Sequence, residues 1–200
     1  MSDTTGSMPP PARISADDIA AEAQKIDCDA AAIWAVCDVE SSGGGFLPDG
    51  RPKILFEAHI FGRLTGHKYD RTHPNISSPT WNRALYGAGG AHQHDRLNEA
   101  IGLDRSAALE SASWGMFQIM GFNYGKCDFS SVDEFATAMR ASERAHLNAF
   151  LRFCRSSGLV KFLAAHDWLH FALGYNGPDE AKNNYHVKLE QAYQRRSTTA

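Results

Sequence analysis

The sequence predicts a single, mainly α-helical domain with one small β element. Apolar residues recur at spacings of three and four along most of the chain, and capping residues and glycines interrupt them where helices would begin and end. One stretch, from Phe46 to Phe56, carries a Pro-Asp-Gly turn signal between two short extended pieces. The length of 200 residues, with 43% apolar and 22% charged residues, fits one globular domain.

The first part of the chain is expected to contain three helices. Residues 1–14 are rich in Ser, Thr, Gly and Pro and are expected to form a flexible leader. Ser15 is an expected N-cap, with acidic residues in the first turn, for a helix that ends near residue 26. Further helices are expected over 29–41, where a run of glycines follows, and over 56–64.

The rest of the chain is expected to be helical after one long loop. Residues 67–94 have few apolar repeats, and a loop of this length in a compact domain is usually functional or mobile. Ser131 and Glu134 form a capping-box pattern that predicts one long helix ending at Ser156. The folded domain is then expected to span 15–195, with a tail at 196–200. The other helices are expected over 95–101, 104–112, 114–120, 159–175 and 179–195.

Charge and hydropathy exclude several classes of protein. The formal net charge is −3 and the pI is near 6.3, which argues against a broadly basic nucleic-acid-binding surface. The longest apolar run, Ala30 to Cys37, has 8 residues, well short of the roughly 20 that a membrane span needs. No apolar segment follows the N-terminus, so we expect a protein made in the cytoplasm without a signal peptide and without membrane insertion. The cysteines lack metal-like or redox-like spacing and are expected to be reduced core residues: Cys28, Cys37, Cys127 and Cys154.

Two glutamates fall on apolar helix faces. Ile33, Val36 and Cys37 form a stripe whose next position is Glu40, in the last turn of its helix. Loss of solvation and the negative end of the helix dipole both favour the neutral acid at Glu40. Glu57 is expected in the first turn of the next helix, where the dipole favours the ionised form. Such contrasting environments are typical of an acid and a base, although Glu57 could instead simply cap its helix.

Motifs in the same order resemble those of a known superfamily. The segment from Val39 to Gly44 resembles the Glu-Ser-x-Gly of lysozyme-like glycosidases and soluble lytic transglycosylases. The segments Ser113–Met120 and Ala172–Pro178 resemble that superfamily's Ser-x-Gly-x-x-Gln and Ala-x-x-Tyr-Asn-x-Gly motifs. The block Arg51–His59, with its Pro-Lys-Ile-Leu-Phe-Glu, is more specifically similar to the N-acetylmuramidase domain of phage endolysins. The resemblance covers roughly residues 28–193.

This resemblance implies a lysozyme-like fold and an activity. The enzyme would cleave the β-1,4 bond between N-acetylmuramic acid and N-acetylglucosamine in peptidoglycan, with no cofactor and no metal. Glu40 would be the general acid and Glu57 the second carboxylate, with Asp49 as a possible second acid instead. Trp114 is more typical of a core residue than of a sugar platform. The expected sugar contacts are Ser113, Gln118, Tyr124, Tyr175 and Asn176.

Other functions are compatible with the same residues. A lytic transglycosylase would cut the same bond without water, and a non-catalytic module would only bind the cell wall. His166 and His170 have the spacing of zinc ligands on one helix face, but Asp167 stands where zinc peptidases have Glu. The histidines of His92-Gln93-His94 are expected to be solvated in the long loop.

The biological setting that the resemblance favours is a phage endolysin. It would be a monomer that reaches the periplasm of a Gram-negative host through a holin and acts on glycan strands there. A secreted antibacterial effector with an immunity protein is the alternative setting.

Overall fold

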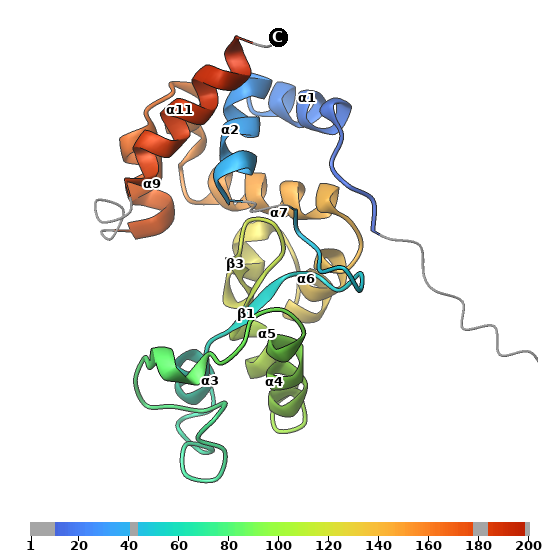
Figure 1. The fold of residues 1–200 in the computed structure, drawn as a ribbon, viewed down its shortest axis with the longest axis vertical. Coiled ribbons are helices and arrows are strands. Elements are labelled where there is room, and N and C mark those ends of the chain that lie inside the picture. The colour runs from blue at the N-terminus through green and yellow to red at the C-terminus, as the bar shows by residue number, and fades with distance from the viewer. Residues whose placement is uncertain (1–10, 41–43, 178–183, 199–200) are drawn as a thin grey trace, which may run out of the picture.

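The structure is a computed structural model that describes residues 11–40, 44–177 and 184–198. It has a helical part, in which α2 contacts α1, α8 and α11, and a second part in which β1 contacts β2 and α4 (Figure 1). The helix α7 contacts α6, α8 and η2 and so lies between these parts. In chain order the elements are α1 (Ala16–Lys25), α2 (Ala30–Glu40), β1 (Ile54–Phe56), α3 (Ala58–Leu64), η1 (Arg83–Leu85), α4 (Ala91–Ile101), α5 (Arg105–Glu110), β2 (Ala112–Trp114), β3 (Ile119–Met120), η2 (Gly121–Cys127), α6 (Val132–Met139), α7 (Glu143–Ser156), α8 (Val160–Ala164), α9 (Trp168–Asn176) and α11 (Tyr185–Ser197).

The sheet is small, antiparallel and ordered β1-β2-β3. In β1, Ile54 and Phe56 are buried and Leu55 between them is partly exposed. Leu55 is paired with Ser113 of β2, so these two residues share the outer face of the sheet. The backbone stays extended at Glu57, which therefore continues the face of Leu55.

The predicted helix over 114–120 is wrong. These residues form the end of β2, a turn and β3. Gly115 and Gln118 adopt positive φ angles of 71° and 47°, which a helix does not contain. A Cβ on Gly115 would also lie 2.8 Å from ring atoms of His146, so only glycine fits there. The apolar spacing of this segment reflects a tight, buried turn rather than a helix face.

Two predicted long helices are each divided in the structure. The helix predicted over 131–156 is α6 and α7, because Ser142 accepts a hydrogen bond from the Ala145 N–H and caps a new start. The helix predicted over 159–175 is α8 and α9, separated at His166, whose φ is +54°. Of the helix predicted over 179–195, residues 179–183 lie outside the described part of the chain, and the rest is α11, which begins at Tyr185. In each divided helix a local capping residue overrides a continuous apolar period.

The long segment 67–94 is largely irregular but tied to its surroundings. Tyr69 donates its hydroxyl to the Leu103 carbonyl, and Ser77 bonds Asp70 at 2.5 Å. The helix α4 begins at Ala91, earlier than predicted, and buries Gln93 and His94. The expectation of solvated histidines is therefore wrong for His94, which bonds the Pro52 carbonyl at 2.8 Å.

A buried glutamate, Glu143, holds a segment that precedes α1 and a segment that follows α2. The carboxylate of Glu143 accepts hydrogen bonds from the backbone N–H of Ile14 at 3.0 Å and of Gly45 at 2.8 Å. Its own N–H donates to Ala12, so residues near the end of the predicted leader pack against the start of α7. This cluster fixes the backbone at Ile14 and Gly45.

The core is formed mainly by apolar side chains from α2, α7, α9 and the sheet. Phe117 stacks on Phe150 with ring centroids 4.3 Å apart, and Phe171 and Tyr175 extend this aromatic layer. Trp114 is 1% exposed and belongs to the core, as expected. Cys37, Cys127 and Cys154 are buried as expected and Cys28 is partly buried. Among the described residues no helix is long and apolar enough to cross a membrane.

Candidate active site

Glu40 is the last residue of α2 and lies in a largely desolvated position. Burial raises the pKa of its carboxyl, as the stripe of Ile33, Val36 and Cys37 predicted. The hydroxyl of Tyr185, the first residue of α11, donates a hydrogen bond to Glu40 and opposes that rise in pKa. A raised pKa favours the protonated form, which is the form that a general acid needs.

Two cavities meet at Glu40 and Gln118. The wider cavity, of about 440 Å³, extends along β1 past Lys53 and Leu55 toward Gly90. The narrower cavity, of about 180 Å³, is bounded on its far side by α9. Together they form a groove with Glu40 near its middle. The lining residues are Glu40, Gly44, Leu47, Lys53, Ile54, Leu55, Gly90, Gly115, Met116 and Gln118 for the wider cavity, and Glu40, Phe117, Gln118, Ile119, Met120, Asn123, Phe153, Tyr175 and Asn176 for the narrower one.

Ser113 and Gln118 form a fixed pair at the groove. The Ser113 hydroxyl donates to Gln118 Oε1 at 2.8 Å, and Gln118 Nε2 donates to the Gly115 carbonyl at 2.8 Å. The oxygen and the nitrogen of the Gln118 side-chain amide are thus both engaged within the protein, which fixes the orientation of the amide. Ser113 itself is 6% exposed, so of the two Gln118 presents more surface to a ligand.

The predicted sugar contacts from the later segments differ in placement. Tyr175 lines the narrower cavity, but its hydroxyl donates to the Phe117 carbonyl at 2.7 Å and its ring packs among core aromatics. Asn176 ends α9, lines the same cavity and hydrogen-bonds Tyr185. Tyr124 packs against the core and lines neither cavity. Asn123, for which the sequence pattern gives no signal, lines the same cavity as Asn176.

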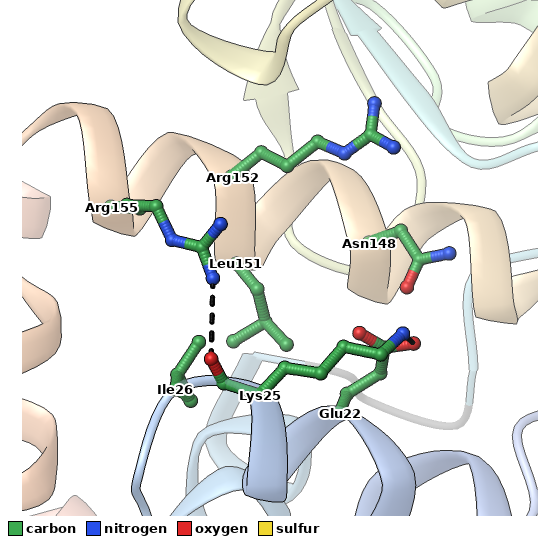
Figure 2. Close-up of a pocket in the computed structure, with 7 residues that line it drawn as sticks. All are labelled: Glu22, Lys25, Ile26, Asn148, Leu151, Arg152 and Arg155. Carbon is green, nitrogen blue, oxygen red and sulfur yellow. Dashed lines mark hydrogen bonds and ion pairs between the residues drawn. The ribbon is translucent and has the colours of Figure 1, made fainter.

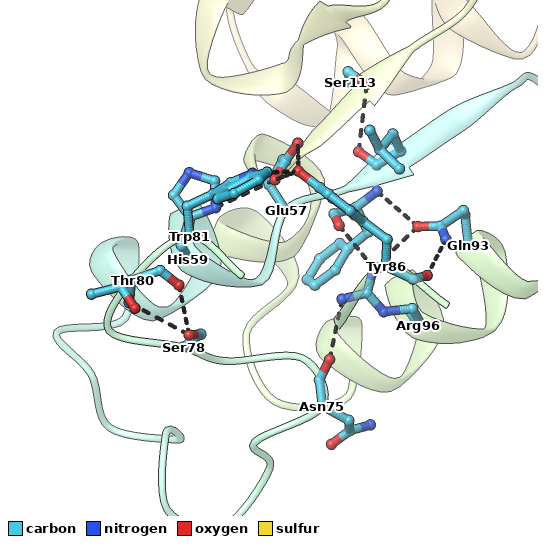
Figure 3. A network of polar contacts seen from close by, with 12 residues as sticks. Glu57, His59, Asn75, Ser78, Thr80, Trp81, Tyr86, Gln93, Arg96 and Ser113 are labelled. Carbon is cyan, nitrogen blue, oxygen red and sulfur yellow. Dashed lines mark hydrogen bonds and ion pairs between the residues drawn. The ribbon is translucent and has the colours of Figure 1, made fainter. Parts of the chain in front are cut away.

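Glu57 is the N-cap residue of α3 rather than a member of its first turn, which corrects the sequence-based placement. Its side chain makes no capping hydrogen bond, so the capping interpretation is wrong. Instead the Tyr86 hydroxyl lies 2.9 and 2.8 Å from the two carboxylate oxygens, and His59 Nδ1 lies 3.3 Å from one of them (Figure 3).

Tyr86 is held in place by a polar network from the segment 67–94 and α4. Trp81 Nε1 donates to the Tyr86 hydroxyl at 2.9 Å, and Gln93 Nε2 donates to the Tyr86 carbonyl at 2.7 Å (Figure 3). Burial lowers the pKa of the nearby Arg96, and the charge of Glu57 opposes this effect. Burial and the hydrogen bond to Glu57 both raise the pKa of Tyr86, which keeps it a donor. Periodicity gave no signal for Tyr86 or Tyr185.

Asp49 lies in a different environment. It is exposed and its carboxylate pairs with Arg51 at 2.6 Å. Neither Asp49 nor Glu57 belongs to the lining of the two cavities. The hydrogen bonds from Arg51 hold the pKa of Asp49 below its usual range. The turn that carries Asp49 is therefore wet, as the sequence predicted.

The metal-site alternative is not supported. His166 precedes α9 and pairs with Asp29 at 2.5 Å, while His170 pairs with Asp167 at 2.8 Å. The two histidines are thus satisfied by separate carboxylates. Within the described ranges no group of three or more His, Cys, Asp or Glu residues is arranged to hold a metal ion.

A separate cavity of about 200 Å³ lies between α1 and α7 (Figure 2). Its one carboxylate, Glu22, is paired with Lys25 at 2.7 Å, and Arg155 donates to the Lys25 carbonyl at 3.4 Å. This lining cannot supply both an acid and a base, so the groove at Glu40 is the candidate active site.

Residues 29–197 match the muramidase family, described as N-acetylmuramidase. The chain belongs to this family. A similar solved structure is the crystal structure of Burkholderia AP3 phage endolysin, with 38% identity and a TM-score of 0.87. The match covers 98% of this chain and 75% of that one. No curated protein matches the chain significantly.

Membership confirms the expected mainly α, lysozyme-like fold and the expected enzyme class. This muramidase is a glycosidase that degrades peptidoglycan. Of the motif that begins at Glu40, residues 41–43 lie outside the described part of the chain. Gly44 is described with φ at +102°, and a Cβ there would lie 2.7 Å from Glu143 Oε1.

Proposed function

We propose that this muramidase hydrolyses the β-1,4 bond between N-acetylmuramic acid and N-acetylglucosamine, with Glu40 as the general acid. The observation that carries the proposal is the position of Glu40, a partly buried carboxyl with a raised pKa where two cavities of a groove meet. A glycan strand in that groove would pass directly over the carboxyl. A protonated carboxyl beside the bridging oxygen is what glycosidic cleavage requires.

Tyr185 acts through Glu40 as a positioning residue. Its hydroxyl is fixed on one carboxyl oxygen, which leaves the other oxygen to hold the proton that goes to the leaving group. After bond cleavage Glu40 is a carboxylate, and the same Tyr185 hydrogen bond stabilises that charge. Tyr185 therefore favours transfer of the proton from Glu40 to the leaving oxygen as the bond breaks.

Glu57 supplies the second carboxylate in this proposal and accepts a proton from the attacking water. It lies on the outer face of the extended β1 segment, two residues beyond Leu55 of the groove lining. Tyr86 and the nearby Arg96 stabilise negative charge there. Asp49, by contrast, is exposed and its charge is neutralised by Arg51. A charged network built around Glu57 favours a hydrolase with two carboxylates over a transglycosylase with one.

Gln118 and Asn176 are the proposed hydrogen-bonding contacts to the sugar, because both line the groove next to Glu40. Ser113 contributes by orienting Gln118, and Tyr175 contributes its ring to the wall of the narrower cavity. Tyr124 is proposed to support the cavity wall from the core. None of these contacts requires a cofactor.

The ranking of three variants tests the catalytic assignment. Glu40→Gln is expected to reduce lysis of outer-membrane-stripped cells by at least about 10³-fold, and Glu57→Gln by about 10²-fold or more. Asp49→Asn is expected to cost less than about tenfold. Circular dichroism would establish that each variant is folded. If Asp49→Asn were the more damaging of the last two, the second role would move to Asp49.

We further propose that the enzyme is a phage endolysin. The support is its similarity to a phage endolysin of known structure. In that setting a holin would admit it to the periplasm, where it acts on glycan strands as a monomer. Expression in a Gram-negative host should lyse cells only when a holin is co-expressed. Holin-independent poisoning relieved by a neighbouring gene product would indicate an effector with an immunity protein instead.

A further inference from the structure

We propose that Trp81 forms an additional sugar-binding subsite beyond Glu57, which stacks against one pyranose ring of the bound glycan strand. This inference rests on the proposed function, because it extends the same groove. The residues that build the subsite are Trp81, Tyr86 and Glu57, and all are drawn in Figure 3.

The first observation is the exposure of Trp81. Its side chain is 60% exposed, the highest value among the exposed large hydrophobic residues of the described chain, which otherwise range from 39% to 45%. Tryptophan is usually well buried, and removing such a large apolar ring from water is favourable. An indole left this open is therefore a strong candidate for a ligand contact.

The second observation is that the indole does not move freely. Its N–H is bonded to the Tyr86 hydroxyl at 2.9 Å, and the two rings meet edge to face with centroids 6.5 Å apart. Tyr86 is fixed in turn by Glu57 and by Gln93. A side chain that is already ordered loses little conformational entropy when a ligand covers it. The structure thus holds an exposed ring in a defined position before any ligand binds.

The third observation is a chain of contacts that leads from the end of β1, beside the groove, to Trp81. The wider cavity runs from Glu40 to Leu55 and Gly90, and Glu57 continues the outer face of β1 beyond Leu55. The Tyr86 hydroxyl is hydrogen-bonded to the Glu57 carboxylate, and the Trp81 N–H donates to that hydroxyl. A polymeric ligand that fills the wider cavity and continues past Glu57 would therefore reach the indole.

The chemistry of the surroundings favours a sugar over an apolar partner. One face of a β-linked pyranose ring carries C–H groups, and these pack against the electron-rich face of an indole. The rim around Trp81 is polar, with the hydroxyl of Tyr86, the ring of His59 and the carbonyl of Thr80, which accepts from Ser78. A single aromatic face with hydrogen-bonding groups around it suits a hydroxylated ring, whereas protein docking sites are broader apolar patches.

The test compares variants on peptide-free glycan strands separated by length. Trp81→Ala and Trp81→Phe both lose the N–H contact to Tyr86, so Trp81→Phe is the reference for the loss of the aromatic face. Relative to Trp81→Phe, Trp81→Ala is expected to raise KM about tenfold for long strands at equal kcat, because it removes binding that is equal in ground and transition states. The shortest strands that are cleaved do not reach the subsite, so the two variants should cleave them alike. Trp81→Phe keeps an aromatic face but loses the indole N–H, and should stay within about threefold of the wild type. Leu169→Ala, which alters an exposed apolar residue of α9 outside the groove, should behave like the wild type.

Other outcomes overturn the subsite. An unchanged KM for Trp81→Ala at every strand length would do so, and so would a loss in Trp81→Phe as large as in Trp81→Ala. The second result would mean that Trp81 acts through the hydrogen bond from its N–H to Tyr86 and not by stacking on a sugar ring. Failure of the proposed function has a different signature, because the wild-type protein would release no new sugar ends from any strand. In that case the subsite is still tested by tryptophan emission: long strands should change the emission of the Glu40→Gln protein but not of the Glu40→Gln, Trp81→Phe protein.

Discussion

Two opposing effects act on the carboxyl of Glu40. Burial raises its pKa and favours the protonated acid, while the hydroxyl of Tyr185 donates to it and favours the carboxylate. Burial is the larger effect, so the pKa stays raised. Because a general acid must be protonated before the reaction and ionised after it, this balance sets the alkaline limb of the pH–rate profile.

Tyr185→Phe should therefore shift the alkaline limb to higher pH. The variant loses the donor that stabilises ionised Glu40, so the pKa of Glu40 rises further and the acid stays protonated over a wider range. The maximum kcat should fall by about tenfold because the carboxyl is less well oriented. The measurement is kcat against pH on purified peptidoglycan. Tyr193→Phe, on the same helix but packed on His166 and Trp168, is the matched control and should leave the profile unchanged. A shift to lower pH would contradict the balance described here.

The sequence could predict the desolvated position of Glu40, but not the tyrosines that hydrogen-bond to Glu40 and Glu57. The stripe of Ile33, Val36 and Cys37 points directly at position 40 because all four residues share one helix. Tyr185 and Tyr86 come from elements 145 and 29 residues away from the carboxylates that they bond, and no local spacing links them. Their roles depend on tertiary packing alone.

The turn between β2 and β3 shapes the groove. Gly115 lies in the groove lining, its N–H donates to the Lys53 carbonyl at 2.8 Å, and its positive φ redirects the chain toward Gln118. His146 packs beneath it and accepts from the Met116 N–H at 3.2 Å. The turn is thus held between β1 and α7.

Gly115→Ala should destabilise the protein by about 2 kcal/mol, since the new Cβ is strained at this φ and meets the ring of His146 at 2.8 Å. Urea unfolding followed by circular dichroism measures the change. Gly125→Ala, in the neighbouring η2, is the control, because a Cβ there would have no atom within 4 Å. Equal stabilities for the two variants would show that the turn tolerates a side chain.

The elements also show where sequence patterns lose information. Helix existence was predicted well because the apolar period is long and strong, as in α2 and α7. The β2–β3 turn was predicted as a helix because its apolar residues are buried on several sides, which erases the period of two. The breaks at Ser142 and His166 do not interrupt the apolar pattern, because the apolar residues on either side remain compatible with one helix. A capping residue inside an apolar pattern carries the missing information.

Two buried histidines join distant parts of the whole molecule. His94 of α4 bonds the Pro52 carbonyl, and His146 of α7 bonds the Met139 carbonyl at 2.7 Å while it accepts from the Met116 N–H. Burial lowers the pKa of both rings. A protonated His146 would have to give up its acceptor role toward Met116.

The stability of the fold should therefore fall in mild acid. A histidine in the unfolded chain has a pKa of about 6.5, whereas the pKa values of the folded His94 and His146 are lower. At a pH between the folded and unfolded pKa values, only the unfolded state binds the proton. The stabilisation is fully present above the unfolded pKa and is lost as pH falls through the folded values. His146→Gln should reduce the loss of unfolding free energy between pH 7.5 and pH 5, because the variant lacks this titrating ring. Urea unfolding at both pH values measures it, and an equal or larger loss in the variant would contradict the account.

The measurement that tests the central claim most directly is mass spectrometry of the sugar ends released from purified peptidoglycan. If Glu40 protonates the leaving oxygen and water completes the reaction, the wild-type protein releases strands that end in reducing N-acetylmuramic acid, and folded Glu40→Gln releases none. Anhydro-muramic acid ends would instead identify a transglycosylase. Reducing ends produced by Glu40→Gln at the wild-type rate would contradict the assignment of Glu40.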